Sequence, residues 1–504
     1  MEWQMAIDML TRRWFIGGLC SSVAVRRPGA FAAGASSGMQ LARLGVLSDI
    51  HLDEPERAGC FRKALLHFCD AGVDGVVIAG DIANLGRLSE LDLCAHIWFD
   101  VFPDDKAPDG RHVERLFVYG NHDVEAWWWH PKMKAMDAEW KKQNALGCGD
   151  LYARAWEKCF HEEYKPIWRK TLNGLTFIGT HWENRKGYNP PIEPYLKEHG
   201  REIDPSLPFF YIQHPHPKDT VYGPHAWGHD GGESTRALSA FPNAVALSGH
   251  SHYSLTDERS VWQGAFMSIG TASLYDSSTE YTDAENGNRN RFDPREKDAE
   301  RKRIMRSVSQ AGRQGMLFDV FRDHLLIRRH SFIDDAPLGD DWNVPLPSSS
   351  DAPFAFVKHA KRRQPPKFPA GAVVSAKVLK SPPPCARKGF DEPCVHVTFP
   401  GAHPVGKCRV FGYEVRVIGA GGVALLARRV LAPGFNRPLQ KDEPQGECLF
   451  ALSELPAGTL LKFEVRAKEC FGRVSSPISS QTISIASPEQ EKQQVTGPSV
   501  TMTT

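Results

Sequence analysis

Aspartate, asparagine and histidine occur in five short segments of this chain, and these residue types bind divalent metal ions. The segments are Asp49-Ile50-His51, Gly80-Asp81, Gly120-Asn121-His122-Asp123, His214 and Gly249-His250-Ser251-His252. Carboxylate oxygens and imidazole nitrogens are the ligands of metal pairs that activate water for phosphate ester cleavage. One carboxylate can bridge two ions, and an asparagine carbonyl binds without adding charge. The set therefore predicts a two-metal hydrolytic site.

Each segment follows a short apolar run that is typical of a β-strand. The runs are Leu44–Leu47, Val76–Ala79, Leu116–Tyr119, Phe209–Ile212 and Ala244–Leu247. Ligands at several strand ends converge only if the strands share one sheet system. Asp49 and His51 can both turn toward one ion once the strand breaks its alternation, and His250 and His252 can serve two adjacent ions. The glycines that precede the ligands allow sharp turns and close backbone approach. They are Gly80, Gly120 and Gly249.

The pattern between the segments predicts an α/β architecture. Helical spacing of apolar residues predicts helices over 62–71 and 88–99, and their alternation with strands favours parallel pairing. From residue 175 onward strands dominate, which indicates a second sheet packed on the first. The runs 316–321 and 324–329 predict a hairpin, and the charged stretch 283–313 predicts a solvated helix or loop rather than a lid.

The five segments together resemble the motifs of the calcineurin-like metallophosphoesterase superfamily, and the resemblance covers residues 41–335. The resemblance implies a four-layer αββα sandwich. It implies that one metal ion is held by Asp49, His51, Asp81 and His252. It implies that the other is held by Asp81 as the bridge, Asn121, His214 and His250. His216 is a second imidazole close to His214, and the family's placement of the ligand directly at the strand end favours His214.

The resemblance also implies roles in catalysis. His122 would approach the phosphate as a general acid or charge stabiliser, and Asp123 would orient His122 through a hydrogen bond. Metal-bound hydroxide would attack phosphorus in line. Purple acid phosphatases carry a tyrosine three residues after the bridging aspartate, where this chain has Asn84. We therefore expect two divalent or transition metal ions, Mn, Fe or Zn, without a tyrosine ligand.

Three functional hypotheses follow. The first is a metal-dependent phosphoric ester hydrolase that prefers a small-molecule or polymer phosphodiester. The second is a phosphomonoesterase or nucleotidase. The third, from another class, is a non-catalytic binding scaffold whose β-sandwich contacts a surface or glycan. The run Trp127–Trp129 offers aromatic rings near the cleft, either to stack on a base or sugar or to pack under the loop. His181 also follows an apolar run, and we expect it to be structural.

The remaining segments predict the domain organisation. Residues 1–33 resemble a twin-arginine export signal, with Arg12-Arg13 and a short apolar stretch; an ordinary secretory signal is the alternative. We therefore expect an exported, periplasmic or extracellular protein without a transmembrane segment. Residues 336–369 are Pro- and Ser-rich, as in a linker, and the alternating strands of 370–486 resemble a fibronectin type III or immunoglobulin-like sandwich. The tail 487–504 is polar and predicts disorder. A net charge of +1 gives no reason to expect general nucleic-acid binding.

Overall fold

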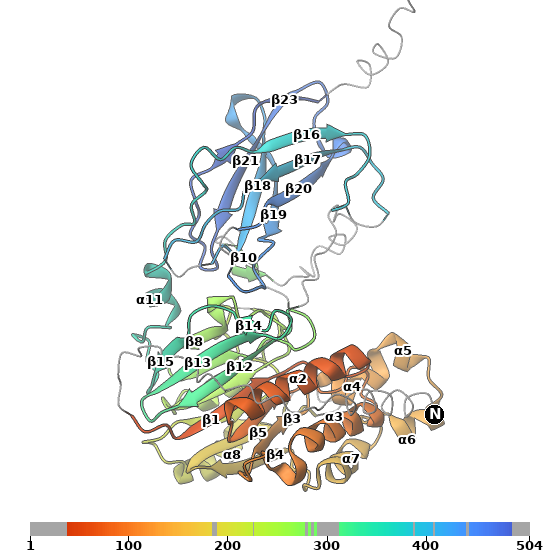
Figure 1. Ribbon diagram of the computed structural model, residues 1–504, viewed down its shortest axis with the longest axis vertical. Helices are drawn as coiled ribbons and strands as arrows, with labels where there is room; N and C mark the ends of the chain where they lie inside the picture. Colours follow the sequence, from red (N-terminus) through yellow and green to blue (C-terminus); the bar gives the residue numbers. More distant parts are fainter. Residues whose placement is uncertain are drawn as a thin grey trace, which may run out of the picture. The chain divides into compact units, whose positions relative to one another are not determined.

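The computed structural model in Figure 1 describes most of the chain. The described residues are 38–183, 189–224, 226–277, 281–283, 287–289, 312–386, 389–406, 409–439 and 443–485. The predicted export signal, the C-terminal tail and most of the charged stretch 283–313 lie outside these ranges.

The first sheet contains seven strands in the order β14-β13-β12-β1-β2-β3, with β15 also paired to β13. Strands β1, β2 and β3 pair in parallel, whereas β12 pairs antiparallel with both β1 and β13. Their bounds are β1 (Ala42–Leu47), β2 (Gly75–Ala79), β3 (Glu114–Val118), β12 (Gln314–Val320), β13 (His324–Ser331), β14 (Ala336–Pro337) and β15 (Trp342–Pro345). The sheet is therefore mixed, with a parallel centre that aligns three of the predicted strand ends.

The second sheet has six strands in the order β4-β5-β6-β7-β9-β8. Strands β5, β6, β7 and β9 pair in parallel, and β4 and β8 are antiparallel edges. The bounds are β4 (Ile167–Leu172), β5 (Leu175–Thr180), β6 (Phe209–Ile212), β7 (Ala244–Ser248), β8 (Val261–Gln263) and β9 (Met267–Gly270). Outside both sheets, β10 (Tyr281–Asp283) and β11 (Gly287–Arg289) form a two-stranded ladder.

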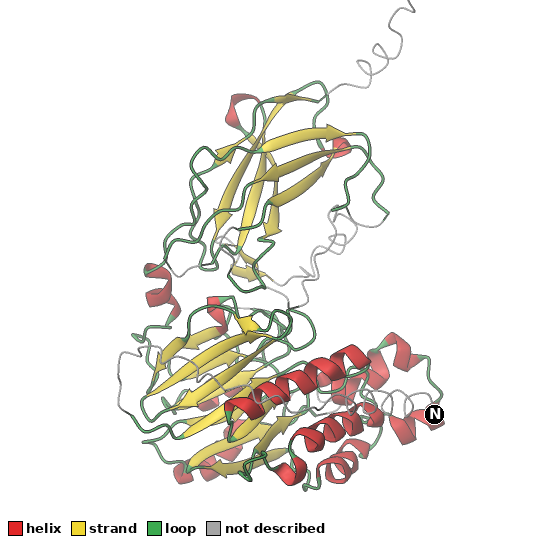
Figure 2. Ribbon diagram, in the orientation of Figure 1, coloured by secondary structure: helices red, strands yellow, loops and turns green. Residues whose placement is uncertain are grey.

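The two sheets pack face to face, and helices cover their outer faces, as Figure 2 shows. Val77 and Leu116 of the first sheet share a buried apolar cluster with Phe177 and Phe210 of the second. The other face of the first sheet packs on α2 (Pro55–Ala71), α3 (Leu88–Val101) and α7 (Leu151–Phe160). The other face of the second sheet packs on α8 (Ile192–His199) and α9 (Glu233–Leu238). These contacts form the predicted α, β, β, α layers.

Short helices complete this region. They are α4 (Asn121–Trp129), α5 (Pro131–Lys134), α6 (Ala138–Asn144), α11 (Phe356–Lys361), η1 (Pro103–Asp105), η2 (Gly200–Glu202) and η3 (Glu258–Ser260). The predicted linker begins too early, because residues 336–337 and 342–345 form β14 and β15 and pair with β13. Helix α2 begins seven residues before the predicted one because Pro55 occupies its first turn, where a missing N–H costs nothing.

Residues 375–484 form strands without a long helix among those described (Figure 2). One sheet has the order β16-β17-β20 and the other β19-β18-β21-β22, with β23 also paired to β21. The bounds are β16 (Ser375–Leu379), β17 (Cys394–Phe399), β18 (Gly412–Ile418), β19 (Ala424–Leu431), β20 (Gly446–Ala451), β21 (Leu460–Lys468), β22 (Ile478–Ser479) and β23 (Ile483–Ser484), with η4 (Ala420–Gly422) and η5 (Leu452–Glu454) between strands. Val397, Val415 and Phe463 bring both sheets into one buried core.

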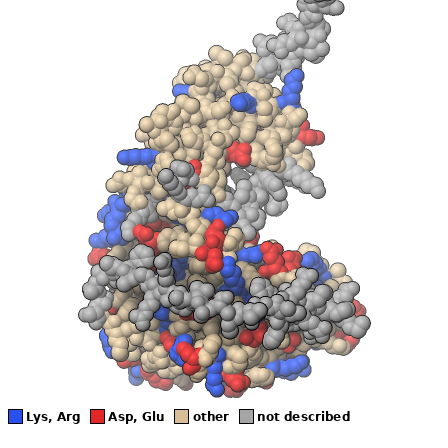
Figure 3. All heavy atoms as spheres, viewed as in Figure 1, with Lys and Arg blue, Asp and Glu red and all other residues tan. Residues whose placement is uncertain are grey.

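Among the described helices, none has the length and apolarity needed to cross a bilayer. On the face drawn in Figure 3, basic and acidic side chains are interspersed over the described surface. The described part of this face therefore presents no large area of a single sign of charge.

Candidate dinuclear metal site

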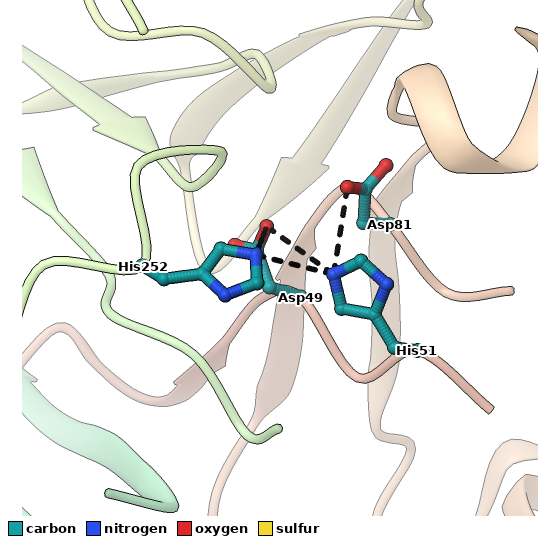
Figure 4. A group of neighbouring side chains, drawn as sticks. All are labelled: Asp49, His51, Asp81 and His252. Carbon is teal, nitrogen blue, oxygen red and sulfur yellow. Dashed lines mark hydrogen bonds and ion pairs between the residues drawn. The ribbon is translucent and has the colours of Figure 1, made fainter. Parts of the chain in front are cut away.

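The five segments come together where β1, β2 and β3 of one sheet and β6 and β7 of the other end. The chain continues the parallel pairing of β1 and β2 into the loops, with Asp49 N donating to Gly80 O at 2.9 Å and Ile50 N to Asp81 O at 2.9 Å. Figure 4 shows the side chains of Asp49, His51, Asp81 and His252 turned toward one another. The convergence predicted from strand ends is therefore realised.

Five of these residues have a left-handed backbone. Their φ angles are 49° at Asp49, 52° at His51, 52° at Asp81, 67° at His250 and 57° at His252. This conformation breaks the strand alternation and lets side chains two residues apart face the same space. Residues with a Cβ atom rarely adopt it, and such strain is concentrated at functional sites.

Asp49, His51, Asp81 and His252 form the first ligand group. His252 Nε2 lies 3.0 Å from Asp49 Oδ1, and His51 Nε2 lies 4.0 Å from the same oxygen and 3.6 Å from Asp81 Oδ2. All four side chains are buried or nearly so. Each therefore offers one ligand atom to a common space of the size of an ion's coordination sphere.

Asp81, His214 and His250 form the second ligand group. His214 Nε2 lies 3.2 Å from Asp81 Oδ2, from Asn121 Oδ1 and from His250 Nδ1. Asp81 belongs to both groups through the same oxygen. Six of the seven residues expected from the resemblance thus form two groups that share one carboxylate, and the seventh, Asn121, lies beside His214 of the second group.

Hydrogen bonds on the far side of three imidazoles determine which nitrogen can bind a metal ion. His51 Nδ1 donates to Asn84 Oδ1 at 3.1 Å, His214 Nδ1 to Ala79 O at 2.8 Å, and His252 Nδ1 to Asp276 Oδ1 at 2.7 Å. In the neutral ring each Nε2 is then an acceptor with a free lone pair. All three Nε2 atoms face the shared space.

Each of these Nε2 atoms lies beside a nitrogen of another imidazole at a distance that suits two ligands of one cation. The Nε2 atoms of His51 and His252 are 3.1 Å apart, and His214 Nε2 is 3.2 Å from His250 Nδ1. In the pair of His51 and His252 two lone pairs face each other and cannot form a hydrogen bond, whereas one cation bound by both would satisfy them. The separations are those of neighbouring ligands at metal–nitrogen bonds of about 2.1 Å. The residues therefore fit two metal ions.

The pKa values within each pair move in opposite directions. Burial, and then the nearby His122, lower the pKa of His51 well below its usual value, while burial and then His214 do the same for His250. Burial also opposes charge on His252 and His214, but Asp49 raises the pKa of His252 to about 10 and Asp81 raises that of His214 to about 9. In each pair one imidazole therefore favours its neutral form and the other its protonated form.

Gly80 and Gly249 are required by close approaches at the site. A Cβ atom on Gly80 would overlap the ring of His214, and one on Gly249 would overlap the carboxylate of Asp49 and the side chain of Ser48. The predicted reason for these glycines is thus confirmed at both positions.

His122 lies at the start of α4, beside the first ligand group. Its backbone N donates to Asp81 Oδ1 at 2.8 Å, and its ring centroid is 4.4 Å from that of His51. Its Nδ1 donates to Asn84 O at 2.7 Å, so Nε2 is the ring atom that can exchange a proton. This placement suits a proton donor or a charge stabiliser.

The expected hydrogen bond from Asp123 to His122 is corrected by the structure. The carboxylate of Asp123 is fully buried and accepts the backbone N–H of Ala83 at 2.7 Å, of Gly120 at 2.7 Å and of Ile82 at 3.3 Å. A short carboxylate at the third helical position is better placed for backbone N–H groups than for the neighbouring ring. Asp123 therefore holds together the turns that carry the ligands, and Asn84 orients His122.

Of the two neighbouring imidazoles, His214 joins the ligand groups and His216 does not. His216 is buried beside Tyr222, at a ring-centroid distance of 6.1 Å, and stands outside both groups. His181 is also structural: its Nδ1 accepts the backbone N–H of Tyr119 at 3.0 Å, and burial lowers its pKa to about 3.

Several aromatic rings border the site, among them those of two tryptophans. Trp227 stacks on His250 with ring centroids 4.8 Å apart and is 39% exposed, and Trp129 packs edge-on against His122 at 4.8 Å. Trp127 instead packs in a small apolar cluster with Leu85 and is not free to stack on a ligand. Trp127 therefore packs under the loop, and the stacking of a base or sugar on this run stays a prediction.

Asp276 was not predicted from the sequence as part of the site. Asn84 was considered only because it stands where purple acid phosphatases have a tyrosine. Both accept a hydrogen bond from a ligand histidine and so fix its tautomer. Asn84 also donates to Asp53 Oδ2, which fixes the orientation of its amide. Asp276 follows the end of β9, a strand that carries no metal ligand. Its place after a strand end was the only feature of the sequence that could have indicated it.

We expect Asp276→Ala to weaken metal binding at the first ligand group by about 10- to 100-fold, because His252 loses the partner that holds its Nδ1 proton. The dissociation constant can be measured by chelator competition. Asp323→Ala is the matched control, since Asp323 makes the same 2.7 Å contact to His324 Nδ1 on the surface. Equal affinity in the two variants would contradict the role given to Asp276.

Residues 42–254 match the calcineurin-like phosphoesterase family. No curated protein matches the chain. Among solved structures, a purple acid phosphatase from yellow lupin (Lupinus luteus) seeds is 12% identical with a TM-score of 0.38, over 60% of this chain and 53% of that chain. The chain thus spans about half the length of the lupin protein.

Two smaller proteins are covered almost completely. A dimetal phosphatase from Danio rerio is 11% identical with a TM-score of 0.33, over 60% of this chain and 98% of that chain. A predicted phosphoesterase from Streptococcus pneumoniae is 11% identical with a TM-score of 0.25, over 60% of this chain and 97% of that chain. On the strength of the family match, residues 42–254 of this chain form a calcineurin-like phosphoesterase domain.

Proposed function

We propose that this protein hydrolyses phosphate esters with two divalent metal ions, and that a phosphodiester is preferred to a monoester. The observation that carries the proposal is the position of one atom. Asp81 Oδ2 lies 3.6 Å from His51 Nε2 and 3.2 Å from His214 Nε2, so a single carboxylate oxygen joins the two ligand groups. Adjacent metal ions with a shared ligand are the arrangement used for in-line displacement at phosphorus.

When bound, the two ions (Mn, Fe or Zn) supply positive charge that neutralises the phosphate oxygens, and they lower the pKa of bound water. The protein's own residues have three tasks. The left-handed turns hold the ligands in place, Asn84 and Asp276 accept the Nδ1 protons of His51 and His252 so that each Nε2 faces the ions, and His122 gives or takes a proton at Nε2. A proton given to the departing ester oxygen would allow an alcohol to leave at neutral pH.

The preference for a diester rests on the rim of the site. Trp227 over His250 and Trp129 beside His122 offer aromatic surface next to the proposed ligands. The second ester group of a phosphodiester can pack on such surface, whereas the terminal oxygens of a monoester gain nothing from it. A phosphomonoesterase or nucleotidase is the second candidate.

Hydrolysis of matched aryl mono- and diesters by protein loaded with Mn²⁺, Zn²⁺ or Fe²⁺ tests the proposal, with EDTA-treated protein as the control. We expect metal-dependent turnover with the diester faster. Absence of hydrolysis by protein shown to carry two ions would leave the scaffold hypothesis standing. Monoester turnover far above diester turnover would reverse the substrate class.

We also retain the proposals of export and of a β-sandwich module. Residues 1–33 would direct export by the twin-arginine route, and fractionation of cells that express the chain with Arg12 and Arg13 replaced by lysine tests this. Residues 370–486 would form a fibronectin type III-like domain that contacts a surface or glycan. Loss of polymer binding with unchanged hydrolysis after truncation at Asp351 supports that role, and unchanged polymer binding contradicts it.

A further inference from the structure

A second group of metal-ligand side chains lies in the C-terminal strands, outside the phosphoesterase domain. Cys385, His396 and Glu447 each direct one ligand atom to a common space. Cys385 Sγ is 3.9 Å from His396 Nε2, and Glu447 Oε2 is 2.9 Å from the same nitrogen. One sulfur, one nitrogen and one oxygen atom therefore meet at a single place.

The sheet β16-β17-β20 holds two of these side chains rigidly. His396 of β17 and Glu447 of β20 point to the same outer face, because Glu447 pairs with Thr398, two residues from His396. Such diagonal neighbours are within reach of each other when their side chains are long. The inward residues Val397 and Cys448 pack in the core of the sandwich, so neither strand can rotate to separate the pair.

The connection from β16 to β17 brings Cys385 over this face. Cys385 and Phe390 pack on Cys394, Leu449 and Ala451, which are buried on the outer face of the sheet. A turn in which Ala386 N donates to Pro383 O at 2.9 Å shapes the connection at this point. Apolar packing thus places the thiol beside the imidazole and the carboxylate.

The geometry distinguishes a metal site from a nucleophilic triad. In a Cys-His-Glu triad the thiol and the carboxylate contact opposite nitrogens of the imidazole, so that the ring can relay a proton. Here Cys385 and Glu447 both approach Nε2. Both groups lie on the Nε2 side of the ring, around the position of a metal ion bound by His396.

The donor set selects the kind of ion. Thiolate, imidazole and carboxylate together suit Zn²⁺, which binds them at about 2.0–2.3 Å. The carboxylate and thiolate would neutralise a divalent charge. The side chain of His396 is 20% exposed and that of Glu447 41% exposed, so solvent can reach a fourth coordination position.

We propose that Cys385, His396 and Glu447 bind one Zn²⁺-like transition-metal ion on the outer face of the β-sandwich, with water as the fourth ligand. Binding breaks the S–H bond of Cys385, forms a metal–sulfur bond and releases the proton to solvent. Burial, reinforced by the Glu447 carboxylate, raises the pKa of the Cys385 thiol to about 12. The positive charge of the bound ion would stabilise the thiolate and so offset this raised pKa.

Cobalt substitution of the full chain tests the site separately from the dinuclear site. Only a sulfur ligand gives an intense thiolate-to-Co²⁺ charge-transfer band in the near ultraviolet, and the dinuclear site offers only nitrogen and oxygen ligands. We expect the band in wild-type protein titrated with Co²⁺, its loss in Cys385→Ser, and at least about 100-fold weaker Co²⁺ binding in His396→Ala. Cys69→Ser, a partly buried thiol far away in sequence, is the control and should keep the band.

Zinc stoichiometry gives a second readout that does not depend on activity. We expect three Zn²⁺ ions per wild-type chain and two in Cys385→Ser, with the far-ultraviolet circular dichroism unchanged. Persistence of the charge-transfer band in folded Cys385→Ser would overturn the proposal, as would a stoichiometry of two in the wild type. Loss of the band in Cys69→Ser would assign the sulfur ligand elsewhere and overturn it too.

Discussion

Asp81→Asn is expected to reduce phosphate ester hydrolysis by at least about 10⁴-fold, because both ligand groups lose their shared anionic oxygen. Asp81 Oδ2 is within 3.6 Å of His51 Nε2 and within 3.2 Å of His214 Nε2. An amide oxygen carries no charge and bridges two cations poorly. Bound metal, measured by plasma mass spectrometry, should fall by more than one ion per chain relative to the wild type.

The fold should survive this substitution, because asparagine has nearly the same volume as aspartate and can accept the His122 N–H that Asp81 Oδ1 accepts. Asp109→Asn is the control, an exposed carboxylate of the same domain that contacts Arg111. Full metal content and activity in Asp81→Asn would rule out the shared ligand. Loss of both in Asp109→Asn would show that the assay reports folding instead.

His122→Ala is expected to lower kcat by about 10²- to 10⁴-fold while leaving two ions bound, because the proton donor is lost and no ligand is removed. The loss should grow with the pKa of the leaving alcohol. An alkyl ester needs a proton on its departing oxygen, whereas a nitrophenolate leaves without one. Rates for a series of diesters with different leaving groups measure this dependence.

The leaving-group series also separates the two roles open to His122. A uniform loss across the series would indicate a charge stabiliser rather than a general acid. His112→Ala is the control, since His112 is an exposed imidazole that contacts Glu114. Unchanged kcat in His122→Ala would remove His122 from catalysis altogether.

Much of the ligand set was predictable because ligands at strand ends leave a local pattern. Asp49, Asp81 and His214 each follow a run of apolar residues, and the run positions agree with β1, β2 and β6 to within about two residues. Buried parallel strands are short and continuously apolar, so their ends are conspicuous in a sequence. The glycine before a ligand adds a second signal where the backbone must pass close to another side chain.

The partners that orient those ligands were less predictable, because hydrogen bonds between distant segments leave no local pattern. Asp276 is 24 residues from His252, and the backbone carbonyl of Ala79 serves His214 without any side chain. Asp123 shows the opposite failure: sequence adjacency to His122 suggested a contact, but three backbone N–H groups compete more effectively for its carboxylate. Strands β14 and β15 were obscured by prolines that suit edge strands as well as linkers.

The left-handed backbone of five proposed ligands lowers the stability of the fold while it positions the metal site. These residues are Asp49, His51, Asp81, His250 and His252. A residue with a Cβ atom is disfavoured there by about 1 kcal/mol, so the five together represent several kcal/mol, which is comparable to the net stability of a small domain. Glycine at any of these positions would relieve the backbone and delete a ligand in the same change. Selection for thermal stability alone would therefore tend to erode the metal site and leave its fold intact.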